Sequence, residues 1–349
     1  MSGDMLAAVY HGPNDLRVER VPMPAIGPDE ALLKVVNSSI CGTDLRILHG
    51  GHRKYPAGTV RIPGHEVVGD IAALGANVKG LAVGQRVFIA PNMGCGHCRQ
   101  CVTGNNNLCA NYDAFGITID GSFAEYMRIP ASTILQGNIM PLDAGVDPAA
   151  AALVEPLACV LRGQNAVRVG LGDVVVVVGA GPIGAMHIML ARLRGANRVI
   201  ASEMIAERRD QALRFGADAA VAPDALAEAV AEASHGEGAD VIIVAAPAHA
   251  AQEAAIGLAA IGGRINFFGG LPKERPTIQL DSNVVHYKEL IVTGTTACST
   301  ADCRQAAAIV NAGRLDLTAL ISARFPLGEA AAAFAAAEDR KSLKVVLEP

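Results

Sequence analysis

The pattern of hydrophobic positions changes near residue 150 and divides the chain into two parts. In the first part, short runs of β-type composition are separated by turn signals such as Gly12-Pro13-Asn14 and Gly27-Pro28-Asp29. Short apolar runs between turns that contain Gly and Pro are typical of a β-rich domain. The predicted strands in this part are 31–36, 67–72, 86–89 and 123–129.

From residue 150 onward, continuous apolar runs alternate with Ala-rich segments of helical spacing. Because strands that are apolar throughout must be covered on both faces, this alternation predicts a doubly wound parallel α/β sheet. The predicted strands are 174–178, 198–202, 240–244, 264–268 and 290–293, with helices such as 182–195 and 205–215 between them. The tail adds predicted helices at 300–312 and 328–338 and a short strand, Lys344–Leu347.

The composition fits a soluble protein of two domains. The chain has 349 residues, of which 51% are hydrophobic, and its net charge is −5 without a marked basic cluster. This charge argues against a nucleic acid or an anionic membrane as partner. Apolar runs such as Val174–Val178 are far shorter than the roughly 20 residues of a membrane helix, and the first ten residues do not resemble a signal peptide. We therefore expect a soluble, cytoplasmic protein.

A dinucleotide-binding turn is predicted directly after the strand 174–178. The run Gly-Ala-Gly-Pro-Ile-Gly has the G-x-G-x-x-G form and lies between a strand and a helix, as that motif requires. The three glycines permit a tight turn, close approach of the pyrophosphate and close packing of the helix on the strand, and the pyrophosphate lies at the helix N-terminus. The residues assigned to the cofactor here are Gly179, Gly181, Pro182, Ile183 and Gly184.

An acidic residue at the end of the next strand predicts NAD rather than NADP. Glu203 lies 24 residues after Gly179, near the spacing at which a carboxylate accepts hydrogen bonds from the adenosine ribose. The same carboxylate would repel a 2′-phosphate. Arg208 and Arg209 leave the preference open, because either guanidinium could meet a phosphate, and Arg208 is counted among the cofactor-binding residues.

Four cysteines within fifteen residues predict a structural metal site. They follow the spacing Cys95-x2-Cys98-x2-Cys101-x7-Cys109. In a cytosolic enzyme such a cluster indicates metal ligands rather than disulfides, and four thiolates close a tetrahedral zinc shell without an open position. His97 lies inside the loop but exceeds the four ligands, so we expect it to face solvent.

Three further segments carry residues that bind catalytic metals. They are Cys41-Gly-Thr-Asp44, Gly64-His-Glu66 and Glu155-Pro-Leu157. Cysteine, histidine and carboxylate side chains bind zinc well, and three protein ligands leave one position for a substrate.

With these motifs, the chain resembles the medium-chain zinc-dependent dehydrogenases, and within them the sorbitol (iditol) or polyol and threonine dehydrogenase branch. The resemblance covers nearly the whole length and also includes Gly121–Tyr126 and Lys288-Glu289-Leu290. It implies a GroES-like β-barrel catalytic domain formed by residues 1–150 and 291–349, with a structural zinc loop at 94–109. It further implies a Rossmann NAD-binding domain at 151–290, two zinc ions per chain, and a homodimer or homotetramer.

The resemblance implies that Cys41, His65 and Glu66 bind the catalytic zinc, with Glu155 nearby. Glu155 stands where classical alcohol dehydrogenases carry a third ligand, so either carboxylate can take that place. His65 and Glu66 would point to opposite sides of an extended backbone, and joint ligation therefore requires a bend, which Gly64 permits. The alternative for Glu66 is a carboxylate paired with an arginine behind the site.

The family also implies a proton relay that begins at the Thr43 hydroxyl. Many relatives continue the relay with a histidine five residues after the cysteine, but this chain has Arg46 there, which cannot act as a base. His49 is the nearby candidate to replace it, and a plain loop histidine is the alternative.

The predicted activity is zinc-dependent, NAD-linked oxidation of a secondary alcohol on a polyol or sugar-like substrate to a ketone. Glu155-Pro-Leu-Ala-Cys159 resembles the polyol branch, whereas Thr295–Ser299 lacks the arginine of sorbitol-oxidising relatives. L-Threonine 3-dehydrogenase is one alternative. A non-catalytic NAD-binding protein is the other, although the intact metal-binding set argues against it. The basic loop of Arg46, His49, His52, Arg53 and Lys54 leaves open a substrate that carries a phosphate or carboxylate.

Overall fold

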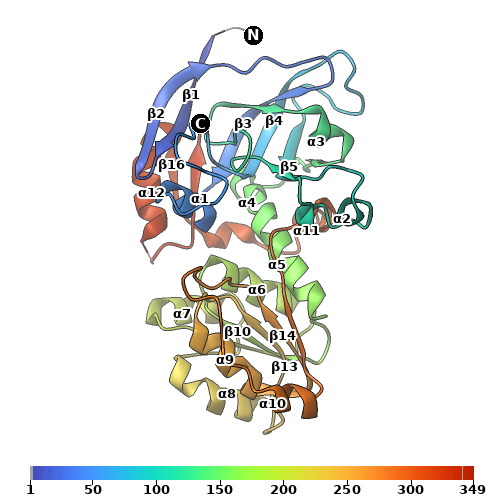
Figure 1. Cartoon of the computed structure of the whole chain (residues 1–349), viewed down its shortest axis with the longest axis vertical. Coiled ribbons are helices and arrows are strands. Elements are labelled where there is room, and N and C mark those ends of the chain that lie inside the picture. The colour runs from blue at the N-terminus through green and yellow to red at the C-terminus, as the bar shows by residue number, and fades with distance from the viewer. Residues whose placement is uncertain (1–2, 340) are drawn as a thin grey trace. The chain divides into compact units, whose positions relative to one another are not determined.

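A computed structural model describes residues 3–339 and 341–349 of the chain. The chain folds into two compact units (Figure 1). The first contains Met1–Ala158 and Cys298–Pro349, and the second contains Cys159–Ala297. The predicted boundaries at 150 and 290 both lie a few residues before the points at which these two units divide the chain. Helix α5 (Val154–Ala166) runs across the first boundary, and strand β15 (Ile291–Gly294) still belongs to the sheet of the second unit.

The first unit is built on a seven-stranded sheet that joins both ends of the chain. Its order is β16-β17-β3-β4-β5-β9, and β8 pairs with β3 outside this path. The strands are β3 (Ala31–Ser39), β4 (Glu66–Leu74), β5 (Arg86–Ile89), β8 (Tyr126–Ile129), β9 (Ile139–Pro141), β16 (Ile321–Pro326) and β17 (Lys344–Glu348). Strand β17 is antiparallel to β3, with Val346 opposite Ser39. The C-terminal strand therefore reaches the region that carries the predicted metal ligands.

Short strands and helices complete the first unit. A hairpin is formed by β1 (Asp4–Gly12) and β2 (Asp15–Pro22), and β6 (Asn92–Met93) pairs with β7 (Asp113–Ala114). The helices are α1 (Gly42–Leu48), α2 (Arg99–Val102), α3 (Ala131–Leu135), α4 (Pro148–Ala152), α11 (Thr300–Asn311) and α12 (Ala330–Glu338). Phe334 of α12 packs edge-on against Phe123, with 5.7 Å between ring centroids. The core of this unit thus combines residues from both of its chain segments.

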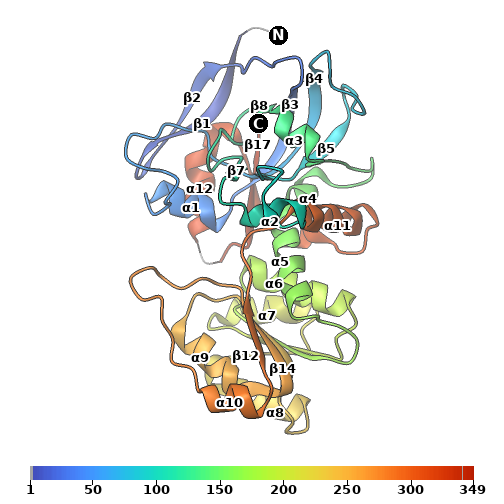
Figure 2. The same cartoon turned by 45° about the vertical axis from the view of Figure 1, so that its right-hand side comes forward.

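The second unit is a six-stranded parallel sheet of order β12-β11-β10-β13-β14-β15. Its other strands are β10 (Val174–Val178), β11 (Arg198–Ser202), β12 (Ala219–Val221), β13 (Ala239–Val244) and β14 (Ala259–Phe267). The connecting helices are α6 (Pro182–Leu193), α7 (Ala206–Arg214), α8 (Leu226–Ala233), α9 (His249–Leu258) and α10 (Ser282–Tyr287). Figure 2 shows this sheet among its helices.

The residues of β10 bury alternate side chains on the two faces of that sheet. Val175 and Val177 pack in a core with Ile188 of α6, whereas Val174 and Val176 pack in another core with Val230 of α8. Both faces of the strand are therefore covered, as its uninterrupted valines predict. The doubly wound α/β fold expected from the sequence is confirmed.

The helices of the described residues are short. The longer ones include α5 with 13 residues and α6 with 12. Within the described part of the chain, none has the length and apolar character needed to pass through a membrane.

Candidate metal centres and nucleotide site

The glycines of the nucleotide turn occupy positions that exclude a side chain. Gly179 has φ +95°, and a Cβ on Gly184 would lie 1.8 Å from the carbonyl oxygen of Gly179. Gly181 is the N-cap of α6 and offers no side chain to the first-turn amides, while Pro182 at N1 has no amide to satisfy. The free amides and the helix dipole make this turn suited to an anion such as a pyrophosphate.

Glu203 lies at the end of β11 beside this turn. Its Oε2 accepts a hydrogen bond of 2.9 Å from the Ala180 amide, and its Oε1 accepts one of 3.0 Å from the Ile205 amide. A cavity of about 560 Å³ adjoins the carboxylate. Most of its lining is apolar, and it includes Val178, Gly179, Pro223, Leu226, Ala246 and Leu258. This arrangement suits an adenosine, with the base in the apolar cavity and the ribose at the carboxylate.

The two arginines near Glu203 have different surroundings. Arg209 donates from Nη1 to the carbonyl oxygens of Glu203 and Met204, both at 2.9 Å, so its guanidinium is tied to the backbone. Arg208 extends toward the glycine turn, because its Nη1 lies 3.5 Å from the position of a Cβ on Gly181. Its buried Nε has no hydrogen-bond partner among the described residues. Of the two arginines, Arg208 is therefore the one that lies beside the glycine turn.

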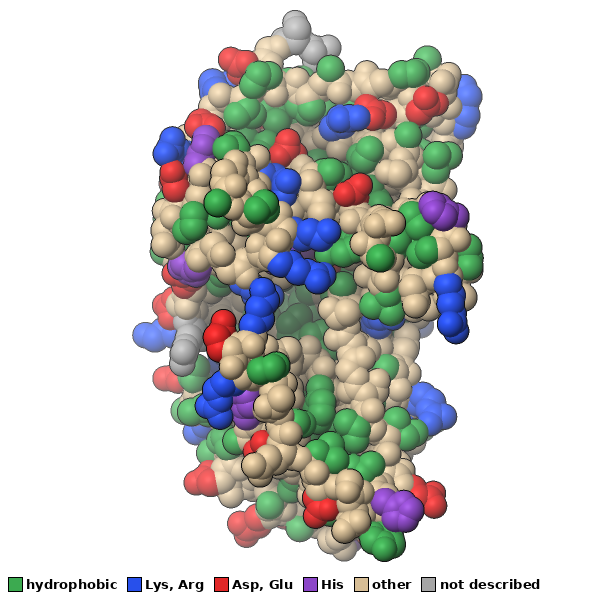
Figure 3. Space-filling model, viewed as in Figure 1, with side chains coloured by type: hydrophobic (Ala, Val, Ile, Leu, Met, Phe, Trp, Pro, Cys, Tyr) green, Lys and Arg blue, Asp and Glu red, His purple; other side chains and the backbone are tan. Residues whose placement is uncertain are grey.

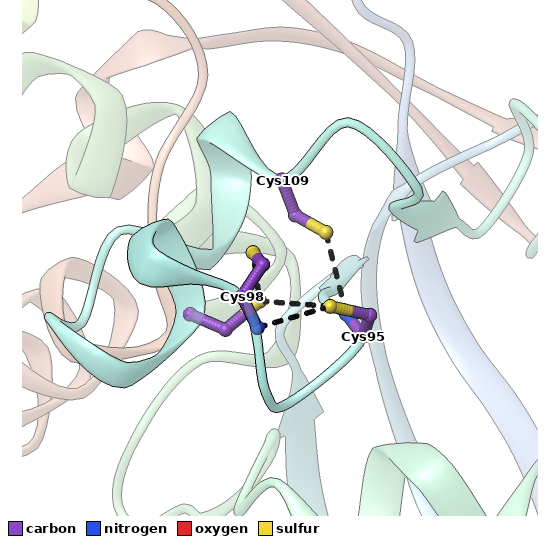
Figure 4. Close-up of side chains that lie close together, drawn as sticks. Cys95, Cys98 and Cys109 are labelled. Carbon is purple, nitrogen blue, oxygen red and sulfur yellow. Dashed lines mark hydrogen bonds between the residues drawn. The ribbon is translucent and has the colours of Figure 1, made fainter.

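The four-cysteine loop brings its sulfur atoms together. The Sγ atoms of Cys95, Cys98, Cys101 and Cys109 all lie within 4.8 Å of one another. Cys101 Sγ is 3.9 Å from Cys95 Sγ and 3.5 Å from Cys98 Sγ. Figure 4 shows Cys95, Cys98 and Cys109 on this loop, with dashed lines for the hydrogen bonds among them. Four sulfurs at this spacing form the donor set of a closed zinc site.

Local backbone geometry favours a thiolate at Cys95 and requires glycine at position 94. Amides of His97 and Cys98 lower the pKa of the Cys95 thiol to about 6, because N–H groups directed at sulfur favour its charged form. A Cβ on Gly94 would lie 2.3 Å from Cys101 Sγ, so only glycine fits there. His97 is exposed, as predicted, and its Nδ1 lies 2.9 Å from the Cys95 carbonyl oxygen.

A second group of possible metal ligands contains Cys41, His65 and Glu66. One ligand atom from each lies within 4.8 Å of the other two. Cys41 directly precedes α1, His65 directly precedes β4, and Glu66 is the first residue of β4. Gly64 has φ +96°, and a Cβ there would lie 2.7 Å from Phe123. The chain therefore bends at Gly64 before the strand begins, and neighbouring residues can face one site.

Asp44 connects the cysteine and the histidine of this group. As N3 of α1, it accepts a 2.9 Å hydrogen bond from the Cys41 amide, which closes a capping box. Its Oδ1 lies 3.4 Å from His65 Nδ1. Burial lowers the pKa of His65, but Asp44 and Cys41 outweigh it and raise this pKa well above its usual value. A carboxylate behind one ring nitrogen orients a histidine that binds a metal through the other.

The partner of Glu66 is a buried cation, Lys344. The sequence analysis did not identify this lysine as a functional residue. Lys344 of β17 is only 4% exposed, and its Nζ lies 2.6 Å from Glu66 Oε2 and 2.9 Å from the Ile40 carbonyl oxygen. Burial lowers the pKa of Lys344, but the charges of Glu66 and Cys41 outweigh this effect and raise it. Glu66 Oε1 is buried without a hydrogen-bond partner in the described structure, so this oxygen has a lone pair for a metal.

Glu155 lies outside the group of Cys41, His65 and Glu66. It occupies the first turn of α5 and is 7% exposed. Its Oε1 accepts a hydrogen bond of 3.5 Å from the Cys298 thiol. Burial raises the pKa of Glu155; the charge of His65 acts against this and that of Glu66 adds to it. Of the two candidate carboxylates, Glu66 is the one grouped with Cys41 and His65.

The predicted relay residues are not all brought together. Thr43 is half-buried in the first turn of α1. His49 ends that helix on the surface, where its Nδ1 lies 2.8 Å from Asn14 Oδ1 and its Nε2 contacts Glu338. Both ring nitrogens therefore have partners outside the metal group, and the relay role of His49 stays a prediction.

In the basic loop, Lys54 already contacts a neighbouring ring, whereas other basic side chains are exposed. Lys54 Nζ lies 5.4 Å from the centre of the Tyr112 ring, and Arg46 and Arg53 are exposed. Figure 3 shows Lys and Arg side chains close together on one face of the first unit. A surface of this kind is open to anions, but no buried partner in the described residues defines a site there.

Comparison with known families matches both units. Residues 27–141 match the alcohol dehydrogenase GroES-like domain, and residues 182–312 match the zinc-binding dehydrogenase family. The chain is 33% identical over 338 residues to the L-threonine 3-dehydrogenase of Bacillus subtilis, and 94% of each chain is covered.

Solved structures of dehydrogenases share the fold over the whole chain. A zinc-binding dehydrogenase of Sinorhizobium meliloti bound to NADP is 34% identical, with a TM-score of 0.91, 99% of this chain and 100% of that chain covered. An alcohol dehydrogenase of Escherichia coli CFT073 complexed with NADH is 27% identical, with a TM-score of 0.90 and 99% of both chains covered.

Proposed function

This chain belongs to the medium-chain zinc-dependent dehydrogenase superfamily, and we propose that it oxidises a secondary alcohol of a polyol or sugar-like substrate to a ketone, with NAD as hydride acceptor. The observation that carries the proposal is the convergence of a thiol, an imidazole and a carboxylate from Cys41, His65 and Glu66. These are the donor types of a catalytic zinc site with three protein ligands and one position for substrate.

The residues present fit a zinc ion. Glu66 Oε1 is a buried acceptor without a hydrogen-bond partner in the described structure, which a cation would satisfy. When bound, zinc supplies a Lewis acid that lowers the pKa of the substrate hydroxyl. Asp44 orients His65, and Lys344 holds the second oxygen of Glu66. We assign the second zinc ion to the four-cysteine loop, where it has a structural role.

The proton released by the substrate needs a path to solvent. Thr43 lies two residues after Cys41, and we assign its hydroxyl the first transfer. The guanidinium of Arg46 cannot accept the proton further out. His49 remains the predicted next acceptor, and a pH–rate profile that is the same in His49→Ala would exclude it.

The cofactor assignment to NAD rests on Glu203. Its carboxylate borders the apolar cavity, where it would accept hydrogen bonds from both ribose hydroxyls and repel a 2′-phosphate. Arg208 lies at the glycine turn, where its guanidinium could pair with a cofactor phosphate. Such a pairing would be compatible with NADP as well as NAD. We expect a lower KM for NAD than for NADP in the same assay, and the reverse order would refute the Glu203 argument.

L-Threonine is the second candidate substrate. The similarity to L-threonine 3-dehydrogenases at 33% identity favours it. The segment Glu155–Cys159 favours polyols instead, since Glu155 places a second carboxylate near His65 and Glu66 to accept hydroxyl hydrogen bonds. The two candidates share the fold and the metal chemistry, so only the substrate distinguishes them.

A substrate screen tests the proposed function. Zinc-loaded protein is assayed for NADH formation with polyols, polyol phosphates, sugar acids and L-threonine. We expect the highest kcat/KM with an unphosphorylated polyol and at least a hundredfold loss in Cys41→Ala. Turnover of L-threonine alone would select the second candidate. Absence of turnover with every alcohol, in protein that binds NADH, would refute the enzymatic assignment.

A further inference from the structure

The buried face of helix α9 carries a polar side chain. The buried residues of this helix are Gln252, Ala255 and Ile256. Positions that follow one another at i, i+3 and i+4 form the stripe of a helix that normally holds apolar side chains. Gln252 is nevertheless only 5% exposed. Because a buried amide without hydrogen bonds is costly, the partner of this glutamine indicates why it stands there.

The partner is the backbone that follows strand β14. Gln252 Nε2 donates a 2.9 Å hydrogen bond to the carbonyl oxygen of Gly269. Gly269 lies two residues after Phe267, the last residue of β14. Its amide donates a 2.9 Å hydrogen bond to the carbonyl oxygen of Val244, the last residue of β13. Gly269 is therefore held on two sides, by α9 through its carbonyl oxygen and by β13 through its amide.

Close backbone contacts continue from Gly269 to the glycine turn. A Cβ on Gly269 would lie 2.8 Å from the carbonyl oxygen of Ala245, so a side chain does not fit there. The amides of Ala245 and Ala246 donate to the carbonyl oxygen of Val178, the last residue of β10, at 2.9 and 3.0 Å. A Cβ on Gly179 would lie 3.2 Å from Ala246 Cβ. The segments that follow β10, β13 and β14 are thus packed against one another.

These segments form the carboxyl edge of the parallel sheet, across which dinucleotides bind in a doubly wound fold. Such a fold consists of two mononucleotide-binding halves. Strands β10, β11 and β12 form the first half here, and β13, β14 and β15 form the second. The cavity beside Glu203 adjoins the end of β11 and suits the adenosine. Gly269 therefore belongs to the half of the sheet that is left for the nicotinamide mononucleotide.

We propose that Gln252 is a positioning residue for the nicotinamide half of the cofactor. It acts through the backbone of Gly269, which it fixes against the end of β13. A methionine at this position would retain the length of the side chain but leave the Gly269 carbonyl oxygen without this donor. The proposal rests on the proposed use of a dinucleotide, and it does not depend on the alcohol or on the metal.

Binding of two ligands to the full chain tests the proposal. NADH contains both mononucleotide halves, whereas AMP contains the adenosine half alone. We expect Gln252→Met to raise the Kd for NADH about tenfold and to leave the Kd for AMP unchanged. Ile256→Val is the matched control, because it shortens a buried side chain of the same helix without a change at Gly269. This control should retain both affinities, although its thermal stability falls.

Hydrogen exchange of the unsubstituted protein gives a second measurement that does not depend on how the variant folds. The amides of Phe268 and Gly269, which both donate to the Val244 carbonyl oxygen, should exchange more slowly with NADH than with AMP.

Three results would overturn the role of Gln252. They are an unchanged Kd for NADH in Gln252→Met, an equal loss of affinity for NADH and AMP, and equal exchange of these amides in the two complexes. In each of them the unsubstituted protein still binds NADH, so the proposed function is unaffected. An unsubstituted protein that binds neither NADH nor AMP would instead refute the dinucleotide assignment, and the role of Gln252 with it.

Discussion

At the scale of single residues, the two carboxylates of the site have different partners. Glu66 is paired with the buried ammonium of Lys344 and retains one oxygen without a hydrogen-bond partner in the described structure, whereas Glu155 accepts from Cys298. The sequence analysis left both open as the third zinc ligand. Their different surroundings support direct ligation by Glu66 and lead to distinct expectations for the two alanine variants.

We predict that Glu66→Ala loses the catalytic metal and that Glu155→Ala keeps it. Removal of one of three protein ligands should lower zinc affinity and reduce kcat/KM by at least a hundredfold in Glu66→Ala. Zinc content and turnover measured on the same samples check this. If Glu155→Ala instead loses both catalytic zinc and activity, Glu155 is the ligand and Glu66 has only a supporting role.

We predict that Lys344→Met destabilises the metal-free protein. The Glu66 carboxylate would remain buried without its cation, which typically costs about 3–5 kcal/mol. Urea unfolding after chelation is the measurement, since a bound cation could replace the ammonium. Lys344→Arg retains the charge and serves as control, with a smaller expected loss. Equal stability of the Met variant and the parent would show that the pair contributes nothing.

We predict that Gly184→Ala abolishes cofactor binding. Its Cβ would lie 1.8 Å from the Gly179 carbonyl oxygen, so α6 would have to move away from β10. Gly257, in α9, has no atom within 4 Å of an added Cβ. Gly257→Ala should therefore be neutral or stabilise by up to about 1 kcal/mol through helix propensity. NADH fluorescence titration compares the two variants, and unchanged affinity in Gly184→Ala would contradict the close packing of the turn.

At the scale of elements, uninterrupted apolar runs were the most reliable signal. The strands predicted at 174–178, 198–202 and 86–89 have these bounds in the structure. Strand β14 starts at Ala259 rather than at 264, and it contains Gly262 and Gly263, a residue type that is uncommon inside a strand. The pairing of β13 with β14 shifts register near this point, so the glycines mark an irregularity inside a strand. Local composition alone does not distinguish such a bulge from a turn.

The four-cysteine loop is an element without a regular core, and we predict that its stability depends on metal. Cys95→Ser should lower the melting temperature and remove one zinc ion per chain, because a structural site contributes folding energy. His97→Ala changes an exposed side chain of the same loop and should leave both unchanged. Calorimetry with metal analysis checks this. An equal melting temperature in Cys95→Ser would argue against a structural metal.

At the scale of the whole molecule, the two units differ in how the chain builds them. The second unit is one continuous segment with its own sheet and cores, whereas the first combines Met1–Ala158 with Cys298–Pro349. Strand β17 pairs with β3, and Phe334 packs on Phe123. The first unit therefore needs the end of the chain for its sheet and for Lys344.

We predict that the fragment 154–297 folds alone and binds NADH, whereas the fragment 1–158 does not fold cooperatively. The first retains helix α5 and the parallel sheet, and the second lacks β16, β17 and α12. Thermal unfolding followed by circular dichroism, with NADH fluorescence, measures both. A cooperative transition in 1–158 would show that the C-terminal segment is not needed for that sheet.

The sequence by itself determined the features that local spacing encodes. These are the glycine turn after β10, the four-cysteine loop, the bend at Gly64 and the parallel sheet, because each depends on residues close together in the chain. Only the tertiary structure decided the partners of the buried carboxylates: Lys344 is 278 residues from Glu66, and Cys298 is 143 residues from Glu155. Such contacts arise when strands and helices pack, and no local periodicity marks them. In the sequence, the only sign of the pair between Glu66 and Lys344 was a lysine at the start of an apolar strand.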